Sequence, residues 1–267
     1  MKMNKLALIL AVSVLLAGCA TTKSPTGRSQ VLLFDKNQMT EMGAQSFTAM
    51  KKEQKISSNK QKTAYVNCVA NRITAVLPDK SLQWEVVLFD SEQINAFALP
   101  GGHIGVYTGL LTVANDPDQL ATVIGHEVAH VLARHGNEQV SRAQLTNTGM
   151  QLADVALGAG GVSNKDMYMA GLGLGAQVGI LLPFGRDQES EADELGLELM
   201  AKAGFNPAKS VTLWQNMAKA GGEQGPELFS THPSHSTRIS DLKGLQTKVT
   251  PLYQAAKKQA LNQCHQG

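Results

Sequence analysis

The chain has little charge imbalance, few aromatic residues and few cysteines. Among its 267 residues, 24 are lysine or arginine and 22 are aspartate or glutamate, so the formal net charge is +2. Only 5% of the residues are Phe, Trp or Tyr, and no basic stripe or aromatic platform is visible. Nucleic-acid binding needs concentrated positive charge, so this composition predicts no nucleic-acid partner. The length suffices to bury a substantial core.

The N-terminal apolar run is too short to cross a membrane. Residues 6–16 are apolar and follow Lys2 and Lys5, which is typical of a secretory signal rather than a spanning helix. The run leads into a Leu-Ala-Gly-Cys sequence that resembles a bacterial lipobox and ends at Cys19. We therefore expect residues 1–18 to be a lipoprotein signal peptide and Cys19 to carry lipid. A plain signal peptide with an incidental cysteine is the alternative.

The residues after Cys19 indicate where the lipid would place the protein. Ala20 stands where an aspartate would favour retention in the inner membrane, so the resemblance implies the periplasmic face of the outer membrane. Residues 19–30 are polar and contain Ser, Thr, Pro and Gly, which predicts a lipidated N-terminus and tether. Residues 31–267 form the predicted folded domain.

The chain contains only three cysteines. If Cys19 carries lipid, Cys68 and Cys264 remain, and an even pair in an oxidising compartment favours a disulfide. Two free buried thiols are the alternative.

The strongest chemical signal is the sequence Gly-His-Glu-Val-Ala-His at residues 125–130. Two histidines four residues apart lie on one face of a helix, so His126 and His130 can reach one metal ion. Glu127 lies where it can act on a metal-bound water. The alternative, a pair of histidines satisfied within the core, leaves this glutamate in an apolar stretch unexplained.

Flanking residues predict that this segment is helical. Asp116, Pro117 and Gln119 match a capping box with proline at the first helical position. Basic residues followed by Gly136 predict the end of the helix.

Several other elements can be read from residue patterns. We predict helices at 37–55 and 60–77, a strand at 84–89 and a hairpin at 95–108, which contains a Pro-Gly-Gly turn. Residues 140–185 are rich in Gly, Ala, Met and Leu. We expect this segment to form helices that are buried or cover the active site, and contact with a membrane is the alternative.

Residues 186–203 predict an amphipathic helix with two carboxylates on its apolar face, Glu189 and Asp193. Buried carboxylates are rare unless they are paired or bind metal. Glu189 is therefore the expected third metal ligand, and Asp193 is expected to hold the other ring nitrogen of a ligand histidine. An ordinary pair of buried salt bridges is the alternative. Glu191 and Glu194 fall on the opposite, polar face.

A Thr-His-Pro-Ser-His-Ser-Thr-Arg segment places His232 and Arg238 around the start of a final helix. These side chains could stabilise an oxyanion or bind a substrate carboxylate, or could be ordinary surface residues.

The hairpin sequence NAFALPGGHIGVYTGL, with GHEVAHVLARH, ESEAD and THPSHSTR, resembles the zinc metallopeptidase family that includes HtpX and the CAAX prenyl protease, in particular its periplasmic branch. The resemblance covers about residues 31–264. It implies zinc bound by His126, His130 and Glu189, with Glu127 as general base and Asp193 beside the ligands. The family's HP…R pattern falls on His232 and Arg238, and we consider His232 as a fourth ligand that would leave when substrate binds.

The predicted fold is α+β and mainly helical, a gluzincin-like metallopeptidase domain with a small β-sheet. One zinc ion per chain, with water in the fourth position, would support hydrolysis of peptide bonds assisted by Glu127. The hairpin strand formed by Asn95, Ala96, Phe97 and Ala98 is expected to pair with extended substrate. Expected partners are unfolded or misassembled envelope proteins and the outer membrane. A membrane-anchored chaperone or interaction module with a structural or latched zinc is the alternative.

Overall fold

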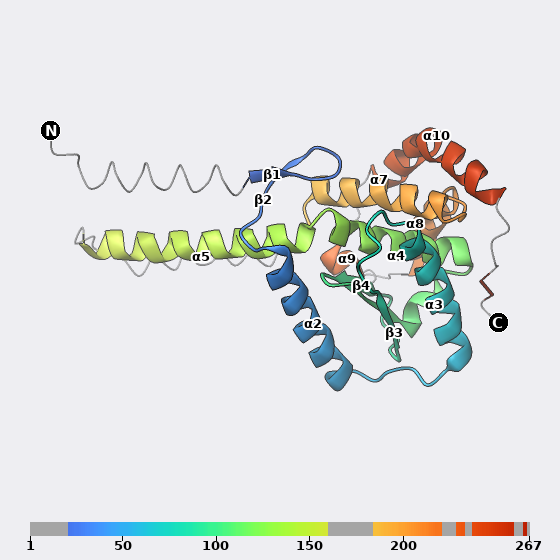
Figure 1. Ribbon diagram of the computed structural model, residues 1–267, viewed down its shortest axis with the longest axis horizontal. Helices are drawn as coiled ribbons and strands as arrows, with labels where there is room; N and C mark the ends of the chain where they lie inside the picture. Colours follow the sequence, from blue (N-terminus) through green and yellow to red (C-terminus); the bar gives the residue numbers. More distant parts are fainter. Residues whose placement is uncertain (1–20, 160–183, 221–227, 233–236, 259–263, 266–267) are drawn as a thin grey trace. The chain divides into compact units, whose positions relative to one another are not determined.

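The computed structural model describes residues 21–159, 184–220, 228–232, 237–258 and 264–265 (Figure 1). The chain divides into two compact units. Among the described residues, unit 1 contains 21–36 and 134–159, and unit 2 contains 37–133 and everything from 184 onward. No described helix is both long and apolar enough to span a membrane.

Unit 1 consists of a short hairpin and a long helix. Strands β1 (Thr21–Lys23) and β2 (Ser29–Val31) pair antiparallel. The long helix is α5 (His135–Ala159). The turn between the strands begins with Ser-Pro-Thr-Gly, and the Gly27 N–H donates to the carbonyl of Ser24 at 2.9 Å. Gly27 adopts φ +93°, which glycine reaches without steric cost.

This hairpin differs from the tether predicted for residues 19–30. The two strands are three residues long and polar, so they lack the alternation of apolar residues by which strands are recognised. Their Ser-Pro-Thr-Gly turn resembles a flexible linker in composition. Cys19 lies outside the described residues.

The sheet of unit 2 confirms the predicted strand and hairpin. Its order is β3-β5-β4, with β3 (Glu85–Phe89) parallel to β5 (His103–Tyr107) and β4 (Ala96–Leu99) antiparallel to β5. Gly101 and Gly102, in the turn between β4 and β5, both have positive φ. Because the strand order is β3-β5-β4, strand β4 lies at an edge of this sheet, and no described strand pairs with its other side.

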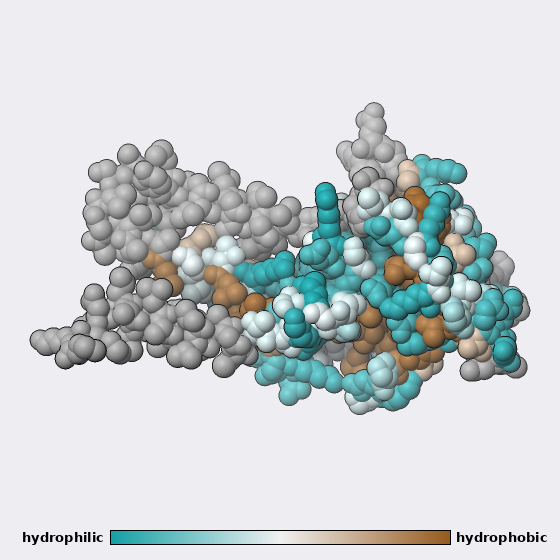
Figure 2. Space-filling model, turned by 90° about the horizontal axis from the view of Figure 1, so that it is seen from above, coloured by the Kyte–Doolittle hydropathy of each residue, from teal (hydrophilic) through white to brown (hydrophobic). Residues whose placement is uncertain are grey.

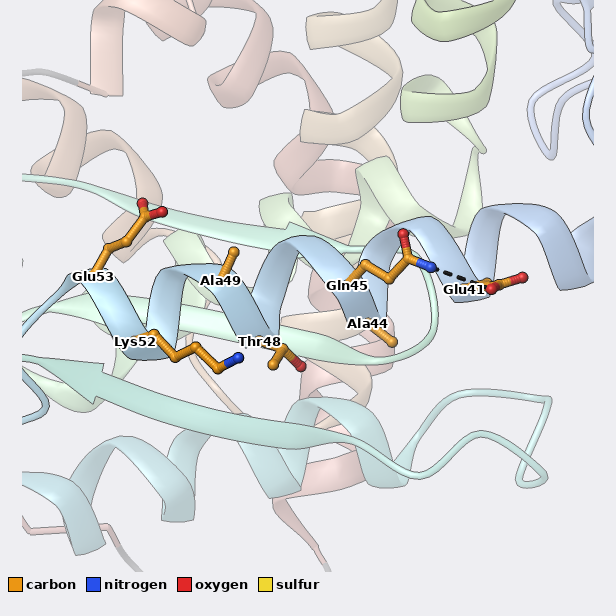
Figure 3. A pocket seen from close by; sticks show the side chains of 7 residues that line it. All are labelled: Glu41, Ala44, Gln45, Thr48, Ala49, Lys52 and Glu53. Carbon is orange, nitrogen blue, oxygen red and sulfur yellow. Dashed lines mark hydrogen bonds between the residues drawn. The ribbon is translucent and has the colours of Figure 1, made fainter.

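Helix α2 (Lys36–Glu53) packs on this sheet through Phe47, which contacts the rings of Phe89, Phe97 and His103. The opposite side of α2 borders an open hollow (Figure 3). Small and polar side chains line it: Glu41, Ala44, Gln45, Thr48, Ala49, Lys52 and Glu53. The hollow shares no residue with the histidine cluster described below.

The remaining helices of unit 2 form a layered core around α4. Their bounds are α3 (Lys60–Ala75), the 3-10 helix η1 (Thr108–Thr112), α4 (Pro117–Leu132), α7 (Arg186–Lys202), α8 (Lys209–Ala220), α9 (Leu228–Thr231) and α10 (Arg238–Lys257). Helix α4 packs against α3, α7, α8 and β4, and α7 also packs against α10. The predicted helices at 37–55, 60–77 and 186–203 are thus confirmed.

Helix α4 begins as predicted and ends earlier than predicted. The Asp116 carboxylate accepts from the backbone N–H of Gln119 at 2.8 Å and from its side-chain amide at 3.0 Å. The helix ends at Leu132, because Arg134 turns the chain with φ +61°. Gly136, predicted to end the helix, lies inside α5. Arginine rarely adopts a left-handed φ, so the sequence pattern favoured the glycine.

The structure bears on two further predictions, the pairing of the two remaining cysteines and the helices at 140–185. The sulfur atoms of Cys68 and Cys264 lie at bonding distance, with their Cα atoms 5.7 Å apart. Residues 140–159 belong to α5, as the helical prediction for 140–185 required, whereas residues 160–183 lie outside the described residues.

Candidate metal centre

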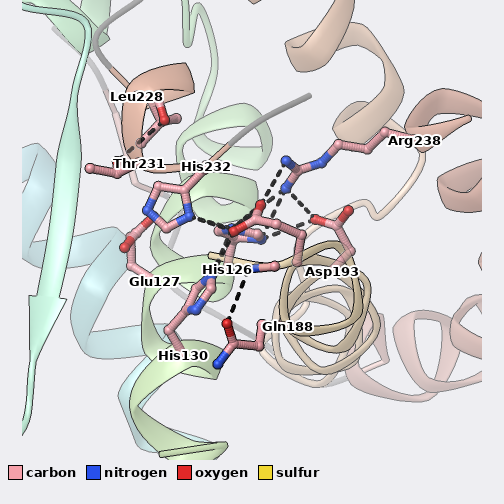
Figure 4. A network of polar contacts seen from close by, with 11 residues as sticks. His126, Glu127, His130, Gln188, Asp193, Leu228, Thr231, His232 and Arg238 are labelled. Atoms are coloured by element: carbon pink, nitrogen blue, oxygen red, sulfur yellow. Dashed lines mark hydrogen bonds and ion pairs between the residues drawn. The ribbon is translucent and has the colours of Figure 1, made fainter. Parts of the chain in front are cut away.

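Four buried side chains converge beside the C-terminal half of α4 (Figure 4). His126 and His130 come from α4, Glu189 comes from the first turn of α7, and His232 directly follows α9. One ligand atom from each lies within 4.8 Å of the others. The structure thus places the three predicted ligands beside His232, the residue considered from the sequence as a fourth ligand.

The distances between these atoms fit a tetrahedral metal ion. The Nε2 atoms of His126 and His130 are 3.1 Å apart. Nε2 of His126 lies 3.4 Å from Oε2 of Glu189, and Nε2 of His130 lies 3.4 Å from Oε1 of the same carboxylate. A tetrahedral ion with bonds of about 2.0–2.2 Å separates its ligand atoms by roughly 3.3–3.6 Å. Two imidazoles and a carboxylate are also the donor types found in catalytic zinc sites. The residues therefore fit a metal ion.

His232 lies at the fourth corner of this arrangement. Its Nδ1 atom is 3.2 Å from Nε2 of His126 and 2.9 Å from Oε1 of Glu189. His232 as a whole residue is 3% exposed. The backbone N–H of His232 donates to the Leu228 carbonyl at 2.8 Å. This hydrogen bond continues the turn of α9 and fixes the backbone of His232.

Asp193 and Arg238 support the ligands from the side away from His130. Nδ1 of His126 lies 3.0 Å from Oδ1 of Asp193, as predicted from the helical spacing of Glu189 and Asp193. Arg238 donates to Glu189 at 2.9 Å and to Asp193 at 2.7 Å. A His126 ring that donates its Nδ1 proton to Asp193 leaves Nε2 available to bind a cation.

Arg238 therefore holds two carboxylates of the protein, whereas the sequence leaves open contact with an oxyanion, contact with a substrate carboxylate, or a position at the surface. It is 1% exposed, and its guanidinium lies 3.6 Å above the ring of Trp214. Trp214, on α8, also stacks on Phe229 of α9 at 5.7 Å. One indole ring thus connects the arginine with the short helix that precedes His232.

The charges of the centre favour a cation between the histidines. Burial alone would lower the pKa of His126, but the nearby charge of Glu189 and the hydrogen bond to Asp193 raise that pKa to about 9. Burial opposes ionisation of Glu189, yet His126 holds the pKa of this carboxyl well below its usual range. Burial lowers the pKa of His130. The carboxylates that favour a proton on His126 would also favour a metal ion.

Glu127 is buried beside the ligands and is 3% exposed. Its Oε1 atom accepts no hydrogen bond from the described residues, and Nε2 of His232 lies 3.5 Å away from it. Burial raises the pKa of this carboxyl. A buried carboxylate oxygen without a protein donor can accept a hydrogen bond from a bound water.

Of the two carboxylates expected on the polar face of α7, Glu194 lies at the surface and Glu191 is buried. Glu194 pairs with Lys248 at the surface of α10, as a residue on the polar face should. Glu191 is 4% exposed, so its predicted exposure was wrong. Helix α7 packs against three helices, α3, α4 and α10, and a single apolar stripe underestimates the burial of a helix enclosed in this way.

Sequence reasoning missed two aromatic residues of the centre. Helical spacing indicates only a core position for Trp214, and Phe184 lies in a segment with few readable signals. The Phe184 ring packs 4.1 Å from the His130 ring, and its backbone N–H donates to the Thr231 carbonyl at 3.1 Å. Neither residue belongs to a ligand pattern, so only their positions in the fold reveal them.

The predicted substrate-binding residues lie on or directly before strand β4. Ala96, Phe97 and Ala98 belong to the edge strand β4, and Asn95 directly precedes it. The Asn95 carbonyl accepts from the backbone N–H of Tyr107 at 3.1 Å, which extends the pairing with β5. Helix α4 packs against β4.

Comparison with known proteins agrees with this geometry. A sequence model described as Peptidase family M48 matches residues 60–246. The chain is 38% identical over 183 residues to mitochondrial metalloendopeptidase OMA1 of Schizosaccharomyces pombe, which covers 68% of this chain and 52% of that protein. It is 32% identical over 243 residues to human OMA1, covering 82% and 44%. Identity to the beta-barrel assembly-enhancing protease of Yersinia pestis is 31% over 198 residues, covering 71% and 40%.

The chain spans about half or less of the length of these relatives. The matched region nevertheless contains both histidines of α4, the α7 carboxylates, His232 and Arg238. Together, the family match and the buried His-His-Glu-His group indicate a metal site in a mainly helical fold with small sheets. The chain belongs to Peptidase family M48.

Proposed function

We propose that the protein is a zinc-dependent endopeptidase that cleaves unfolded or misassembled envelope proteins. The observation that carries this proposal is the convergence of His126, His130 and Glu189, whose facing atoms are 3.1–3.4 Å apart. Membership of family M48 and the metalloendopeptidase names of its relatives support the reaction class. Zinc is the metal that this donor set favours.

The roles of the residues follow from their positions. His126, His130 and Glu189 would hold one zinc ion, which supplies the Lewis acidity that activates water and polarises a peptide carbonyl. Glu127 would accept the proton of the attacking water and transfer it to the leaving amine. Asp193 would keep His126 oriented through Nδ1, and Arg238 would hold Glu189 and Asp193 in place.

The edge of the sheet supports a route for binding substrate. Strand β4 pairs with β5 on one side and with no described strand on the other. An extended peptide could add there through main-chain hydrogen bonds. We assign this role to Asn95, Ala96, Phe97 and Ala98.

We place the protein on the periplasmic face of the outer membrane, anchored by lipid at Cys19. The lipobox carries this part of the proposal, and together with Cys68 and Cys264 it resembles LoiP, an outer-membrane lipoprotein metalloprotease. The similarity to a beta-barrel assembly-enhancing protease supports envelope proteins as substrates and partners.

Chelation tests the reaction class. Purified mature protein should cleave an unfolded protein such as reduced casein, should stop when a chelator removes the metal, and should recover when zinc is returned. Cleavage that persists after metal removal would contradict the proposal.

His232 favours a second candidate, a module whose zinc is latched or structural. Its Nδ1 atom lies within ligand distance of the other candidates, and a fourth protein ligand is typical of structural zinc sites. His232→Ala should raise peptide cleavage if His232 blocks the fourth position, and should lower it if His232 stabilises the oxyanion. Unchanged cleavage would exclude both roles.

A further inference from the structure

Unit 1 fixes the chain that leads to Cys19, instead of leaving it free. Arg28, at the end of the hairpin turn, makes two parallel hydrogen bonds to Glu138 of α5, at 2.7 and 3.0 Å. Glu138 is 2% exposed. Such a bidentate pair with a buried carboxylate is strongly oriented. The Arg134 guanidinium adds a bond to the Lys23 carbonyl at 2.9 Å.

The chain after β2 is held to the same helix. The backbone N–H of Leu33 donates to Oγ of Ser141 at 2.8 Å, and the Asn137 amide donates to the Phe34 carbonyl at 2.7 Å. Asn137 and Ser141 are both buried. The hairpin and α5 therefore form one fixed structure within unit 1 (Figure 1).

Strand β1 begins two residues after Cys19. Two residues span at most about 7 Å. A lipid on Cys19 would therefore hold the hairpin, and with it α5, at the membrane surface.

The face of α5 that binds the hairpin continues into an exposed apolar surface. At 100° per residue, the residue that binds the hairpin, the two that bind the chain after β2 and two leucines fall within an arc of about 100°: Glu138, Asn137, Ser141, Leu145 and Leu152. Leu145 is 49% exposed and Leu152 is 65% exposed, and Figure 2 shows hydrophobic side chains at the surface along α5.

Exposed apolar side chains are concentrated in unit 1. Three of the five large exposed hydrophobic residues among the described residues belong to it: Leu33, Leu145 and Leu152. The described residues of unit 1 also carry more basic than acidic side chains: Lys23, Arg28, Lys36, Arg134 and Arg142 against Asp35, Glu138 and Asp154. Leucines beside basic residues suit the interface of a bilayer that contains anionic phospholipid.

We propose that the Leu145–Leu152 face of α5 docks on the phospholipid bilayer that holds the Cys19 lipid, and that the hairpin fixes this orientation. The proposal rests on the lipid anchor of the proposed function. It makes unit 1 a membrane-contacting element in addition to the anchor.

Depth-dependent fluorescence quenching tests the docking. The lipidated full chain is prepared as Leu145→Cys, Leu152→Cys and, as control, Asn147→Cys, which lies on the opposite side of α5. Each is labelled with a small thiol-reactive dye, and the unsubstituted chain gives the background. The protein is reconstituted into vesicles of phosphatidylethanolamine and phosphatidylglycerol that carry nitroxide-labelled lipid.

Labels at 145 and 152 should be quenched at least about twofold more than the label at 147, because an interfacial helix buries its apolar face about 5–10 Å deep. Equal quenching at the three positions, or none, would overturn the proposal. Blue-shifted emission without quenching would assign the face to a protein partner, such as a second copy, and would also overturn it.

Flotation of the same vesicles separates this inference from the anchor. Protein that floats without selective quenching would leave the anchor intact and refute the docking, whereas protein that does not float would refute both. Glu138→Gln should leave flotation unchanged and reduce quenching at 152, because it releases Arg28 and the hairpin. Unchanged quenching in this variant would refute the role of the hairpin.

Discussion

Gly125 of α4 and Gly196 of α7 lie backbone against backbone, directly beside the metal-ligand candidates. A Cβ atom added to Gly125 would lie 2.9 Å from the Gly196 carbonyl oxygen, and one added to Gly196 would lie 2.8 Å from the backbone N of His126. No side chain could fit between the two helices at this point. This close approach brings Glu189 and Asp193 of α7 within reach of His126.

Gly196→Ala should therefore weaken metal binding. The added methyl group meets backbone atoms, so α7 must shift away from α4, at a cost of about 1–3 kcal/mol in the free energy of unfolding. We expect zinc affinity to fall about 10–100-fold, as when support of a ligand is lost. Competition with a chelating dye measures it. Gly244→Ala in α10 is the control, because its added Cβ meets nothing within 4 Å; equal zinc affinity in both variants would contradict the spacing argument.

Trp214 should act as a positioning residue through Arg238. Trp214→Ala removes the ring beneath the guanidinium and should lower zinc affinity about 10–100-fold, whereas Trp214→Phe should restore most of it because an aromatic face remains. The absorption spectrum of cobalt-substituted protein should change in the alanine variant, since it reports the ligand geometry.

The other tryptophan, Trp84, provides the control for loss of an indole ring. Trp84→Phe should change neither the cobalt spectrum nor zinc affinity, since Trp84 is partly buried against the hydrophobic core directly before β3, whereas the ring that supports Arg238 is Trp214. A parent-like cobalt spectrum in Trp214→Ala would show that Arg238 needs no support from this ring.

Four acidic residues of α7 should respond differently to amide substitution. Glu189→Gln should cut zinc affinity sharply because a charged ligand becomes neutral, and Asp193→Asn should reduce it about 10–100-fold. Glu194→Gln should change stability by less than about 0.5 kcal/mol, since its ion pair is at the surface. Glu191 is buried, so Glu191→Gln should cost about 1–3 kcal/mol of stability without loss of zinc. Zinc loss in Glu191→Gln but not in Glu189→Gln would refute the assigned third ligand.

Cys68 and Cys264 should be linked in native protein isolated under non-reducing conditions. Their sequence separation is 196 residues, and closing so long a loop stabilises a fold by about 5 kcal/mol in the chain-entropy model. Non-reducing mass analysis should find one peptide pair joined. Cys68→Ser should lower the midpoint of thermal unfolding, and two free thiols in the native protein would contradict the link.

Local patterns predicted the parts of the centre that depend on one helix at a time. The 3.6-residue period placed His126 and His130 together, and Glu189 and Asp193 together, because ligands four residues apart share a face. The capping box predicted the start of α4 for a similar reason, since Asp116 and Gln119 interact within one turn.

Contacts between distant segments escaped prediction. Three features depend on how separate helices pack: the stacking of Arg238 on Trp214, the burial of Glu191 and the glycine contact between α4 and α7. Local sequence patterns do not reveal such packing. The β1–β2 hairpin escaped for another reason, because polar strands of three residues have no apolar alternation and are stabilised by Glu138, more than 100 positions away.

The most direct test of the central claim compares the parent protein with Glu127→Gln, measuring zinc content and turnover of an unfolded substrate in the same preparations. Both proteins should contain about one zinc per chain, because Glu127 is not among the metal-ligand candidates. Turnover should fall about 10²–10⁴-fold in the variant, because only the proton transfer is removed. Parent protein without zinc after zinc-replete preparation, or a variant that retains full turnover, would contradict the account.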